Sequence, residues 1–501
     1  MTETTDSQAR PAESQTYAAS LKEAAGRRQR SRNMRPLTRL IPFMMAHKGD
    51  ALAAFFFLLI STSASLGLSF AGRTVIGAIS SGSRVALDQA FLGLGVVAVV
   101  LAAATALRYY FVTKLGERTV ADVRAVVYRH ILTLDQDYFL KTRTGEVLSR
   151  LTVDMTIVEN MLATSISVAL RNILMFFGAI GVLLAVSPRL TGYFAILAPF
   201  VIAPIFIFGR TVRKRTVETQ DRFAAAMGYA GESLDALDTV QAFGREAASS
   251  NRFTDAVNLA FNTSLIRMRA RAIMTALVIV LMFGGVALIL WAGARFVVSG
   301  GMGGDQLFQF VFLSVMAASS VGALGEVWGE LQKASGAMSR IGEILDAHPM
   351  IAPPANPTPL PVPARGEIAF ENVTFAYPTR DEAPALRGFS LHVRPGETVA
   401  LVGPSGAGKS TVLRLLLRFY DPQSGRISID GVNLTEADPR EVRARCALVA
   451  QDASLFSGPA IDNIRFGRED ATEAEIRAAA SDAEAEGFLN ALPEGFSTHI
   501  G

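Results

Sequence analysis

Long apolar stretches without a single charged residue recur along the first two thirds of the chain. Each has the length that a helix needs to cross ~30 Å of hydrocarbon. Helices of soluble proteins rarely lack a charged face over such a length, so six buried helices of one large soluble core are the weaker alternative. The pattern therefore predicts six membrane spans, at residues 51–72, 89–107, 172–188, 190–209, 272–294 and 306–325.

The connections between these spans are of two kinds. Those at 73–88, around Arg189 and at 295–305 are short. Those at 108–171 and 210–271 are long and rich in arginine and lysine. The positive-inside rule predicts that the long connections, the N-terminal tail and the C-terminal part of the chain are cytoplasmic. At 1.5 Å per residue, residues 210–271 could form two antiparallel helices that extend roughly 45 Å beyond the membrane.

Two basic features flank the spans. Residues 22–39 carry seven lysines and arginines against Glu23 alone, which fits either a solvated tail or attraction to anionic lipid headgroups. The hydrophilic first 50 residues do not resemble a cleaved signal peptide. Arg171 directly precedes the third span, where it either snorkels to the cytosolic interface or lines a substrate path.

The composition of the chain further narrows the class of protein and its expected partners. The 501-residue chain is 50% hydrophobic and has a formal net charge of only +3, which indicates a multi-domain membrane protein and gives no reason to expect nucleic acid as a partner. Cys446 is the only cysteine, so no intrachain disulfide can form, and an ordinary core thiol is expected. The five histidines occur singly and lack metal-ligand spacing.

Prolines mark a change of architecture after the last span. Seven of the fifteen residues at 349–363 are proline, which excludes a helix or a central strand and predicts an extended linker. Residues 367–375 and 389–393 then alternate like strands. We expect a basic cytosolic tail at 1–45, a six-span transmembrane domain at 46–345, a proline-rich linker at 346–365 and a mixed α/β domain at 366–501.

A phosphate-binding loop lies in this last domain. Residues 403–410 read G-P-S-G-A-G-K-S, between an apolar run at 398–402 that predicts a strand and a helical pattern at 410–417. Glycines let successive N–H groups point at an anion, and the helix adds its positive end. Lys409 can reach the outer phosphates, and the Ser410 hydroxyl can ligate Mg²⁺. The alternative, a glycine-rich turn with a chance lysine, does not explain the flanks.

The spans, the long connections, the linker and several motifs together resemble a half-transporter of the ATP-binding cassette exporter family, subfamily B type, over roughly residues 35–501. The motifs are the loop at 403–411, F-A-Y-P at 375–378, V-A-Q-D at 449–452 and R-F-Y-D-P-Q-S-G-R-I-S-I-D-G at 418–431. The resemblance implies a six-helix transmembrane bundle with long cytosolic helical extensions, followed by a partial α/β nucleotide-binding domain of the phosphate-loop class.

The resemblance also assigns residues to ATP and Mg²⁺. Tyr377 would stack on the adenine, a contact worth on the order of 1–3 kcal/mol. Gln451 would contact Mg²⁺ and the attacking water, so Lys409 and Gln451 are the expected catalytic residues, and Ser410 and Gln451 the metal ligands. The expected nucleotide-binding residues are Tyr377, Gly403, Pro404, Ser405, Gly406, Ala407, Gly408, Lys409, Ser410, Thr411 and Gln451.

Two segments of the long cytosolic connections resemble the parts of the family that meet the nucleotide domain. They are residues 138–154 and 238–246, and each would carry or adjoin a short transverse coupling helix. The family's signature, the acidic strand end that holds Mg²⁺, the catalytic glutamate and the switch histidine are not found before Gly501. We therefore expect a fragment, or else a degenerate natural protein, that holds nucleotide weakly and hydrolyses it poorly.

The implied function is ATP-driven export or flipping of a hydrophobic or amphipathic substrate, lipid-like or drug-like, by alternating access. A peptide or another solute is the alternative cargo. The expected location is a bacterial-type plasma (inner) membrane, with multiple passes through the bilayer. The expected partner is a second half-transporter, in a homodimer or alternatively a heterodimer. A nonhydrolytic half of a heterodimer and a nucleotide-gated channel or regulator remain open as other functions.

Overall fold

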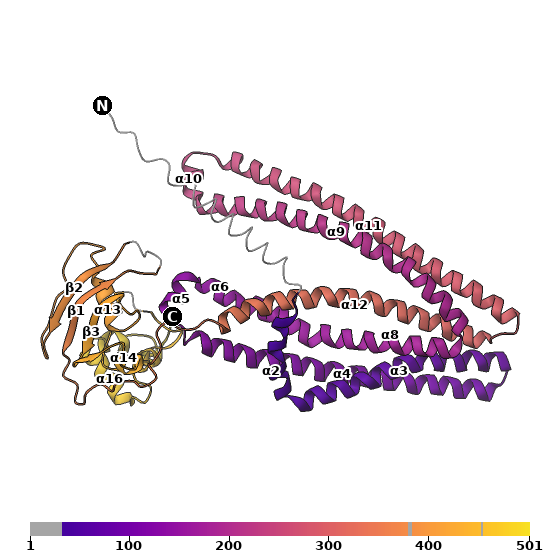
Figure 1. Cartoon of the computed structure of the whole chain (residues 1–501), viewed down its shortest axis with the longest axis horizontal. Coiled ribbons are helices and arrows are strands. Elements are labelled where there is room, and N and C mark those ends of the chain that lie inside the picture. The colour runs from indigo at the N-terminus through magenta and orange to yellow at the C-terminus, as the bar shows by residue number, and fades with distance from the viewer. Residues whose placement is uncertain (1–32, 379–382, 452–453) are drawn as a thin grey trace. The chain divides into compact units, whose positions relative to one another are not determined.

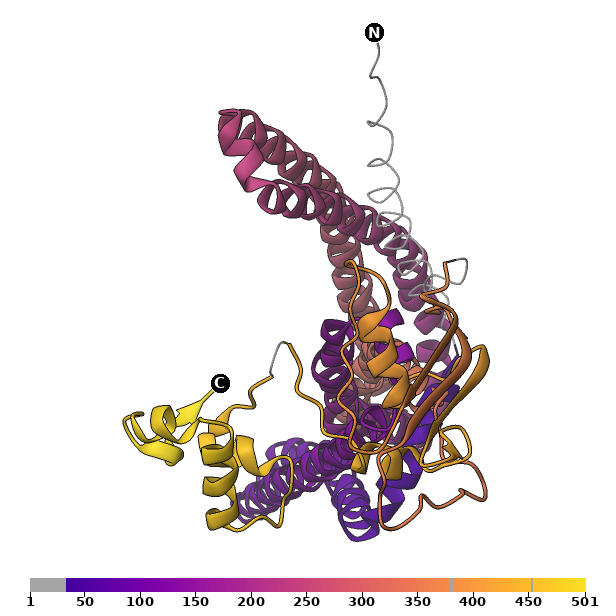
Figure 2. The ribbon, with the colours of Figure 1, turned by 90° about the vertical axis from the view of Figure 1, so that its left-hand side faces the viewer.

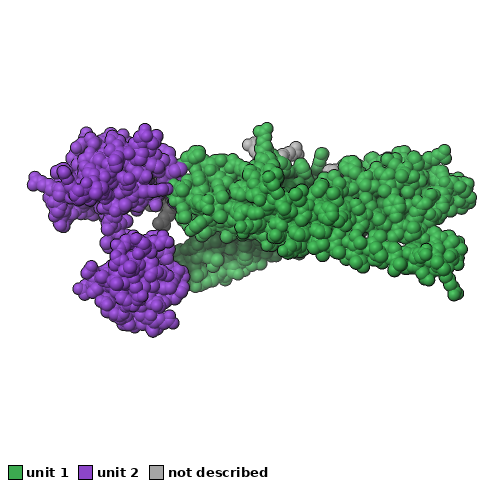
Figure 3. Space-filling view, turned by 90° about the horizontal axis from the view of Figure 1, so that it is seen from below, with its two compact units in different colours: residues 1–134, 142–348 green, residues 135–141, 349–501 purple. Residues whose placement is uncertain are grey.

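The computed structural model describes residues 33–378, 383–451 and 454–501. Most of the predicted basic tail lies outside these residues. The chain divides into two compact units, which we describe separately (Figure 3). Unit 1 comprises residues up to Leu134 together with Thr142–His348, and unit 2 comprises Asp135–Lys141 together with Pro349–Gly501.

Unit 1 is built from helices (Figure 1). Two π-helical turns, η2 and η3, interrupt the long run that ends in α8. The elements are η1 (Arg35–Leu40), α2 (Ile41–Ala46), α3 (Lys48–Ser81), α4 (Arg84–Ile131), α6 (Thr144–Ser149), η2 (Arg150–Asp154), α7 (Met155–Asn160), η3 (Met161–Ser165), α8 (Ile166–Val186), α9 (Pro188–Asp235), α10 (Leu237–Ala242), α11 (Glu246–Val298) and α12 (Gly304–Leu345).

Among the described residues of unit 1, five helical runs are long and apolar enough to cross a membrane: α3, α4, the run Thr144–Val186, α11 and α12. They contain four of the six predicted spans in full and the third, 172–188, as far as Val186, so five spans are confirmed as apolar helices. The remaining span, 190–209, lies inside α9, where the side chains at 201, 202, 205 and 206 are outside the described part. The third span belongs to a helical run that begins 28 residues earlier than predicted, because the preceding cytosolic segment is also helical.

The helices pack as antiparallel pairs. α3 and α4 meet through a short turn at Gly82, whose φ of 68° is left-handed. α9 and α11 pack along their length with α10 at the tip of the pair (Figures 1 and 2), which confirms the predicted antiparallel helices. An apolar core joins α8, α9, α11 and α12 through Ala179, Leu183, Leu190, Ile289, Phe310, Leu313 and Ala317.

Unit 2 combines an antiparallel sheet with short helices. The sheet has the order β2-β1-β3-β4, and α13 packs on it with Val412 and Leu415 in the apolar core. The elements are α5 (Gln136–Lys141), β1 (Ile368–Phe375), β2 (Leu386–Val393), α13 (Lys409–Leu416), β3 (Ser424–Ile429), β4 (Val432–Asn433), α14 (Pro439–Ala444), β5 (Gly458–Pro459), α15 (Ala460–Arg465), α16 (Glu473–Asp482), α17 (Glu486–Asn490), η4 (Gly495–Ser497) and β6 (His499–Ile500).

The predicted strand at 398–402 is wrong. This segment has no strand structure, and Val402 is 89% exposed. A strand exists only when a neighbour accepts and donates its backbone hydrogen bonds. The described sheet pairs β1 with β2 and β3 and provides no such neighbour here, so β-propensity alone does not form the strand.

The proline-rich segment is extended, as predicted, but it is attached to unit 2. Thr358 N donates to Glu436 O at 2.8 Å, and Arg445 Nη2 donates to Pro361 O at 2.9 Å. Leu360 is buried in the apolar core of this unit. The segment is therefore extended and is held on unit 2 by these contacts.

Candidate nucleotide site and coupling segments

The glycine loop at 403–408 has the backbone conformation that its sequence predicts. Gly406 and Gly408 have φ values of 82° and 90°, in the left-handed region that only glycine enters freely. A Cβ on Gly408 would lie 2.7 Å from the carbonyl oxygen of Ala385. Glycine is thus required here twice, for its φ and for its lack of a side chain.

The Lys409 side chain folds back onto the loop. It is the first residue of α13, and its Nζ donates to the carbonyl oxygens of Gly403 and Pro404, both at 2.8 Å. Ser410 follows on the exposed side of the first turn. The N–H groups at the start of a helix have no partner within it, and they carry its positive end. Loop, lysine and helix start therefore form a cradle that fits a phosphate chain.

Tyr377 lies beside this cradle. Its hydroxyl is 3.1 Å from Thr411 Oγ1 in α13, and Arg414 Nη1 donates to it at 3.4 Å. Its ring makes edge contacts with Phe375 and Tyr420, at centroid distances of 5.0 and 5.3 Å. The structure thus brings Tyr377 to the helix of the phosphate loop, and the stacking of its ring on adenine stays a prediction.

Gln451 makes no hydrogen bond to the loop. It is exposed, in a segment without helix or strand, and it makes no hydrogen bond to another residue of the described chain. Its roles toward Mg²⁺ and water stay predictions. The described residues also contain no group of three or more acidic, histidine or cysteine side chains that could hold a metal, so within them Ser410 is the candidate protein ligand next to the loop.

Short helices stand where the two coupling segments were expected. α5 belongs to unit 2, where the carboxylate of Asp135, just before it, accepts hydrogen bonds from the backbone N–H groups of Met350 and of Ile351. α10 belongs to unit 1, and Phe243 directly after it is 76% exposed. One segment is thus integrated with the nucleotide-binding unit, whereas the other presents an apolar side chain to solvent.

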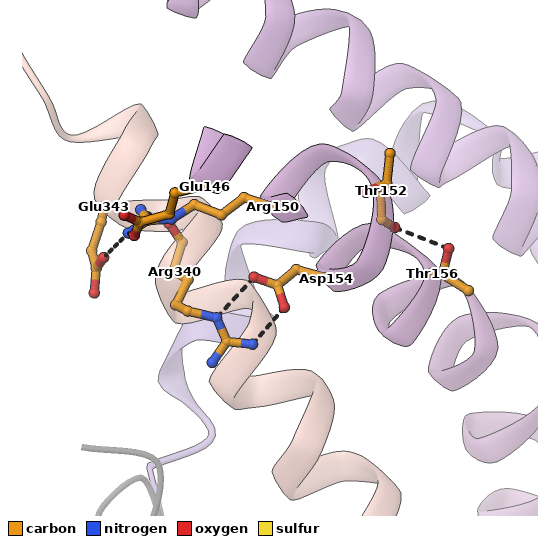
Figure 4. A network of polar contacts seen from close by, with 7 residues as sticks. All are labelled: Glu146, Arg150, Thr152, Asp154, Thr156, Arg340 and Glu343. Carbon is orange, nitrogen blue, oxygen red and sulfur yellow. Dashed lines mark hydrogen bonds and ion pairs between the residues drawn. The ribbon is translucent and has the colours of Figure 1, made fainter. Parts of the chain in front are cut away.

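The rest of the first coupling motif is tied to α12. Asp154 in η2 accepts two hydrogen bonds from Arg340, from Nε at 2.8 Å and from Nη2 at 2.5 Å (Figure 4). The Asp154 side chain is only 8% exposed. Such a bidentate pair fixes geometry as well as charge.

A second arginine of the motif extends this network. Arg150 Nη2 pairs with Glu146 at 2.7 Å and with Glu343 of α12 at 3.1 Å (Figure 4), and its Nη1 donates to the backbone oxygen of Arg340 at 2.9 Å. Sequence analysis identified this motif but missed Arg340 and Glu343. They lie in the charged end of α12, and no local pattern links them to a segment nearly 190 residues away.

Comparisons with known proteins agree with this arrangement. The ABC transporter transmembrane region family matches residues 51–320, and the ABC transporter family matches residues 386–499. The first match covers more than half of the chain, and the second contains the phosphate loop and α13.

Relatives match both regions. The chain is 37% identical over 388 residues to "ATP-dependent permease MDL1, mitochondrial" of Schizosaccharomyces pombe, covering 77% of this chain and 53% of that one. It is 29% identical over 476 residues to a "Putative export ATP-binding/permease protein" of Rickettsia bellii, covering 94% and 81%. It is 30% identical over 478 residues to "ATP-binding cassette sub-family B member 10, mitochondrial" of Mus musculus, covering 92% and 66%.

The chain thus spans about half the length of the first of these relatives and two thirds of the third. Its apolar helical region and its phosphate-loop domain occur in the order of the two family matches. The protein belongs to the ATP-binding cassette transporters, as an exporter half-transporter of subfamily B.

Proposed function

We propose that this chain provides one half of an ATP-driven exporter that moves a hydrophobic or amphipathic cargo, lipid-like or drug-like, by alternating access. The observation that carries the proposal is the phosphate cradle of Gly403–Gly408 with Lys409 at the start of α13, in one chain with long apolar helices. The proposed domains are the tail at 1–45, the transmembrane domain at 46–345, the linker at 346–365 and the nucleotide domain at 366–501.

In this proposal the residues of the cradle bind the triphosphate. Lys409 exchanges the loop carbonyls for the outer phosphates, and the loop amides neutralise their charge. Tyr377 supplies the ring on which adenine stacks. Mg²⁺, when bound, offsets phosphate charge and would be held by Ser410 and Gln451, the latter on the resemblance alone. Gln451 also orients the attacking water.

Hydrolysis requires more than this cradle. Within the described residues no group of three or more acidic, histidine or cysteine side chains could hold a metal, so the proposed ligands are Ser410, Gln451 and the phosphates themselves. We therefore propose that residues 1–501 bind ATP with Mg²⁺ and hydrolyse it slowly. Nucleotide binding would drive transport through its greater affinity for one conformation of the dimer than for the other.

The coupling segments would transmit this preference. α5 is part of the nucleotide-binding unit, and the segment that follows it is bound to α12 by Asp154 and Arg340. A movement of the nucleotide domain would therefore be passed to the last membrane helix. The exposed Phe243 beside α10 would meet a second nucleotide domain.

The partner would be a second copy of the same half-transporter, because one transmembrane region and one cassette make half of a closed two-fold assembly. A heterodimer is the alternative. The membrane would be an inner membrane of bacterial type, with the nucleotide domain and the N-terminus in the cytoplasm. The cargo would be apolar or amphipathic because the predicted spans carry no charge within them.

The test is the variant Lys409→Ala in the full-length natural protein. Binding of a fluorescent ATP analogue is expected to weaken at least about tenfold, which corresponds to ~1.4 kcal/mol, because a charged donor to phosphate is lost. Transport of a labelled lipid into vesicles is expected to stop. The matched control is Lys333→Ala, since Lys333 pairs with Glu330 on the same exposed helix turn at 2.9 Å and is remote in sequence from the loop.

Undiminished ATP-dependent transport by Lys409→Ala would contradict the proposal. Passive conductance that depends on nucleotide, without accumulation of cargo, would instead identify a nucleotide-gated channel. Normal binding with no hydrolysis in the full-length homodimer would identify the nonhydrolytic half of a heterodimer.

A further inference from the structure

Two arginines lie where α4 passes the start of α8, directly after η3. Arg108 of α4 donates from Nη1 to Ser167 Oγ at 2.6 Å. Ser167 and Arg171 are four residues apart in α8, so their side chains lie on the same face of that helix. Arg171 acts electrostatically on Arg108. The two guanidinium groups therefore share one small region.

The packing of α4 against η3 places the two arginines at a similar height along the helices. A Cβ on Gly116 of α4 would lie 2.9 Å from the backbone nitrogen of Ala163. Arg108 lies eight residues before Gly116, and Arg171 lies eight residues after Ala163. The two helical segments run antiparallel, so eight residues along α4 and eight residues through η3 and α8 bring the two arginines to a similar level.

Elsewhere in α4 the charge of an arginine is balanced by an acidic residue. Arg124 of α4 pairs with Glu159 at 3.1 Å. At the level of Arg108 a second arginine takes the place of that acid. The Nε atoms of all three arginines are buried without a hydrogen-bond partner, so the difference at Arg108 and Arg171 is the missing carboxylate. Neither side chain forms an ion pair with any residue in the described ranges. Buried unpaired donors and facing like charges both cost free energy.

The pair stands at the edge of the apolar layer. Arg108 directly follows the apolar stretch 89–107, and Arg171 directly precedes the stretch 172–188. Tyr109 and Tyr110 are exposed next to Arg108, as is typical of aromatic residues at a membrane interface. An anion at this depth would accept from the free donors and neutralise both charges.

We propose that Arg108, Ser167 and Arg171 form a binding site for the anionic headgroup, phosphate or carboxylate, of an amphiphile in the cytosolic leaflet. The level of the site at the boundary of the apolar layer favours a headgroup carried by a lipid chain over a soluble anion. Binding at this site requires no nucleotide, so it stands or falls independently of the ATP-driven activity proposed above.

The test uses the full chain in neutral detergent without nucleotide. Fluorescent phosphatidic acid is the probe, and phosphatidylcholine is the reference. The double variant Arg108→Gln with Arg171→Gln is expected to bind phosphatidic acid about tenfold more weakly and phosphatidylcholine as before. Arg171→Lys keeps the charge and is expected to keep the preference. Arg84→Gln removes the same charge from the exposed other end of α4, and its binding is expected to be unchanged.

A stability measurement separates binding from a structural role. Without an anion, the double glutamine variant is expected to unfold at the same temperature as the parent chain or at a higher one, because like-charge repulsion is removed. Arginines that only support the fold would give a lower temperature. The proposal is overturned if the double variant still prefers phosphatidic acid, or if Arg84→Gln loses the preference equally. Competition by inorganic phosphate as effective as that by lipid overturns the choice of a lipid-borne anion.

Discussion

At the scale of single residues, two glycines of the phosphate loop differ in what they tolerate. Gly406 and Gly408 both have left-handed φ values, 82° and 90°. A Cβ on Gly406 would meet nothing within 4 Å, whereas one on Gly408 would lie 2.7 Å from Ala385 O. The first glycine is required only for its backbone conformation, and the second also for its missing side chain.

This contrast predicts unequal costs for the same substitution. Gly406→Ala is expected to destabilise the nucleotide domain by about 1–2 kcal/mol, the cost of the left-handed conformation. Gly408→Ala is expected to cost more, because a backbone carbonyl cannot move aside as a flexible side chain can. Denaturant unfolding of the purified chain measures both. Equal costs would show that the contact with Ala385 is relieved without strain.

At the scale of elements, η2 contacts α12 through two ion pairs, Asp154 with Arg340 and Arg150 with Glu343, and the first of them is the more buried. Asp154 is 8% exposed and Arg340 is 37% exposed. Asp154→Asn removes the charge that compensates Arg340 and leaves a half-buried guanidinium without its carboxylate. Because Arg340 is partly solvated, the expected loss of stability is below the roughly 3–5 kcal/mol known for fully buried pairs. Thermal unfolding in detergent measures it.

The control for this pair lies in the same network. Glu343 is 59% exposed and pairs with Arg150. Glu343→Gln is expected to cost less than about 1 kcal/mol, as is typical of exposed ion pairs. In the full-length transporter Asp154→Asn should also weaken the dependence of transport on ATP more than Glu343→Gln does. Similar effects of the two variants would argue against a special role of the buried pair.

The elements also show which features a sequence reveals. The apolar helices are predictable because hydrocarbon length and lack of charge are local properties, and the phosphate loop because its chemistry lies in nine consecutive residues. The strand at 398–402 was wrong because a strand requires a neighbour that local sequence does not specify. The Asp154–Arg340 pair joins residues 186 positions apart, and the facing arginines of α4 and α8 depend on helix register. Neither arrangement can be predicted from the sequence without knowing how the helices pack.

At the scale of the whole molecule, the charge of the connections predicts an orientation that labelling can test. Cys446 is the only cysteine. Burial raises the pKa of its thiol, so little reactive thiolate forms at neutral pH, and Cys446→Ala gives a silent background. In that background, Ser83→Cys labels the turn between α3 and α4, and Ser250→Cys labels the first turns of α11. Both serines are exposed.

The positive-inside rule sets the expected result. A membrane-impermeant maleimide added to intact cells should modify the Ser83→Cys variant at once, because the rule places the short turn between α3 and α4 on the outer side. It should modify the Ser250→Cys variant only after the cells are permeabilised, because the rule places the basic connection that holds Ser250 on the cytoplasmic side. The opposite order would reverse the topology, place the phosphate loop outside the cytoplasm and remove its source of ATP. Labelling of both variants in intact cells would mean that one of the helices between them does not cross the membrane.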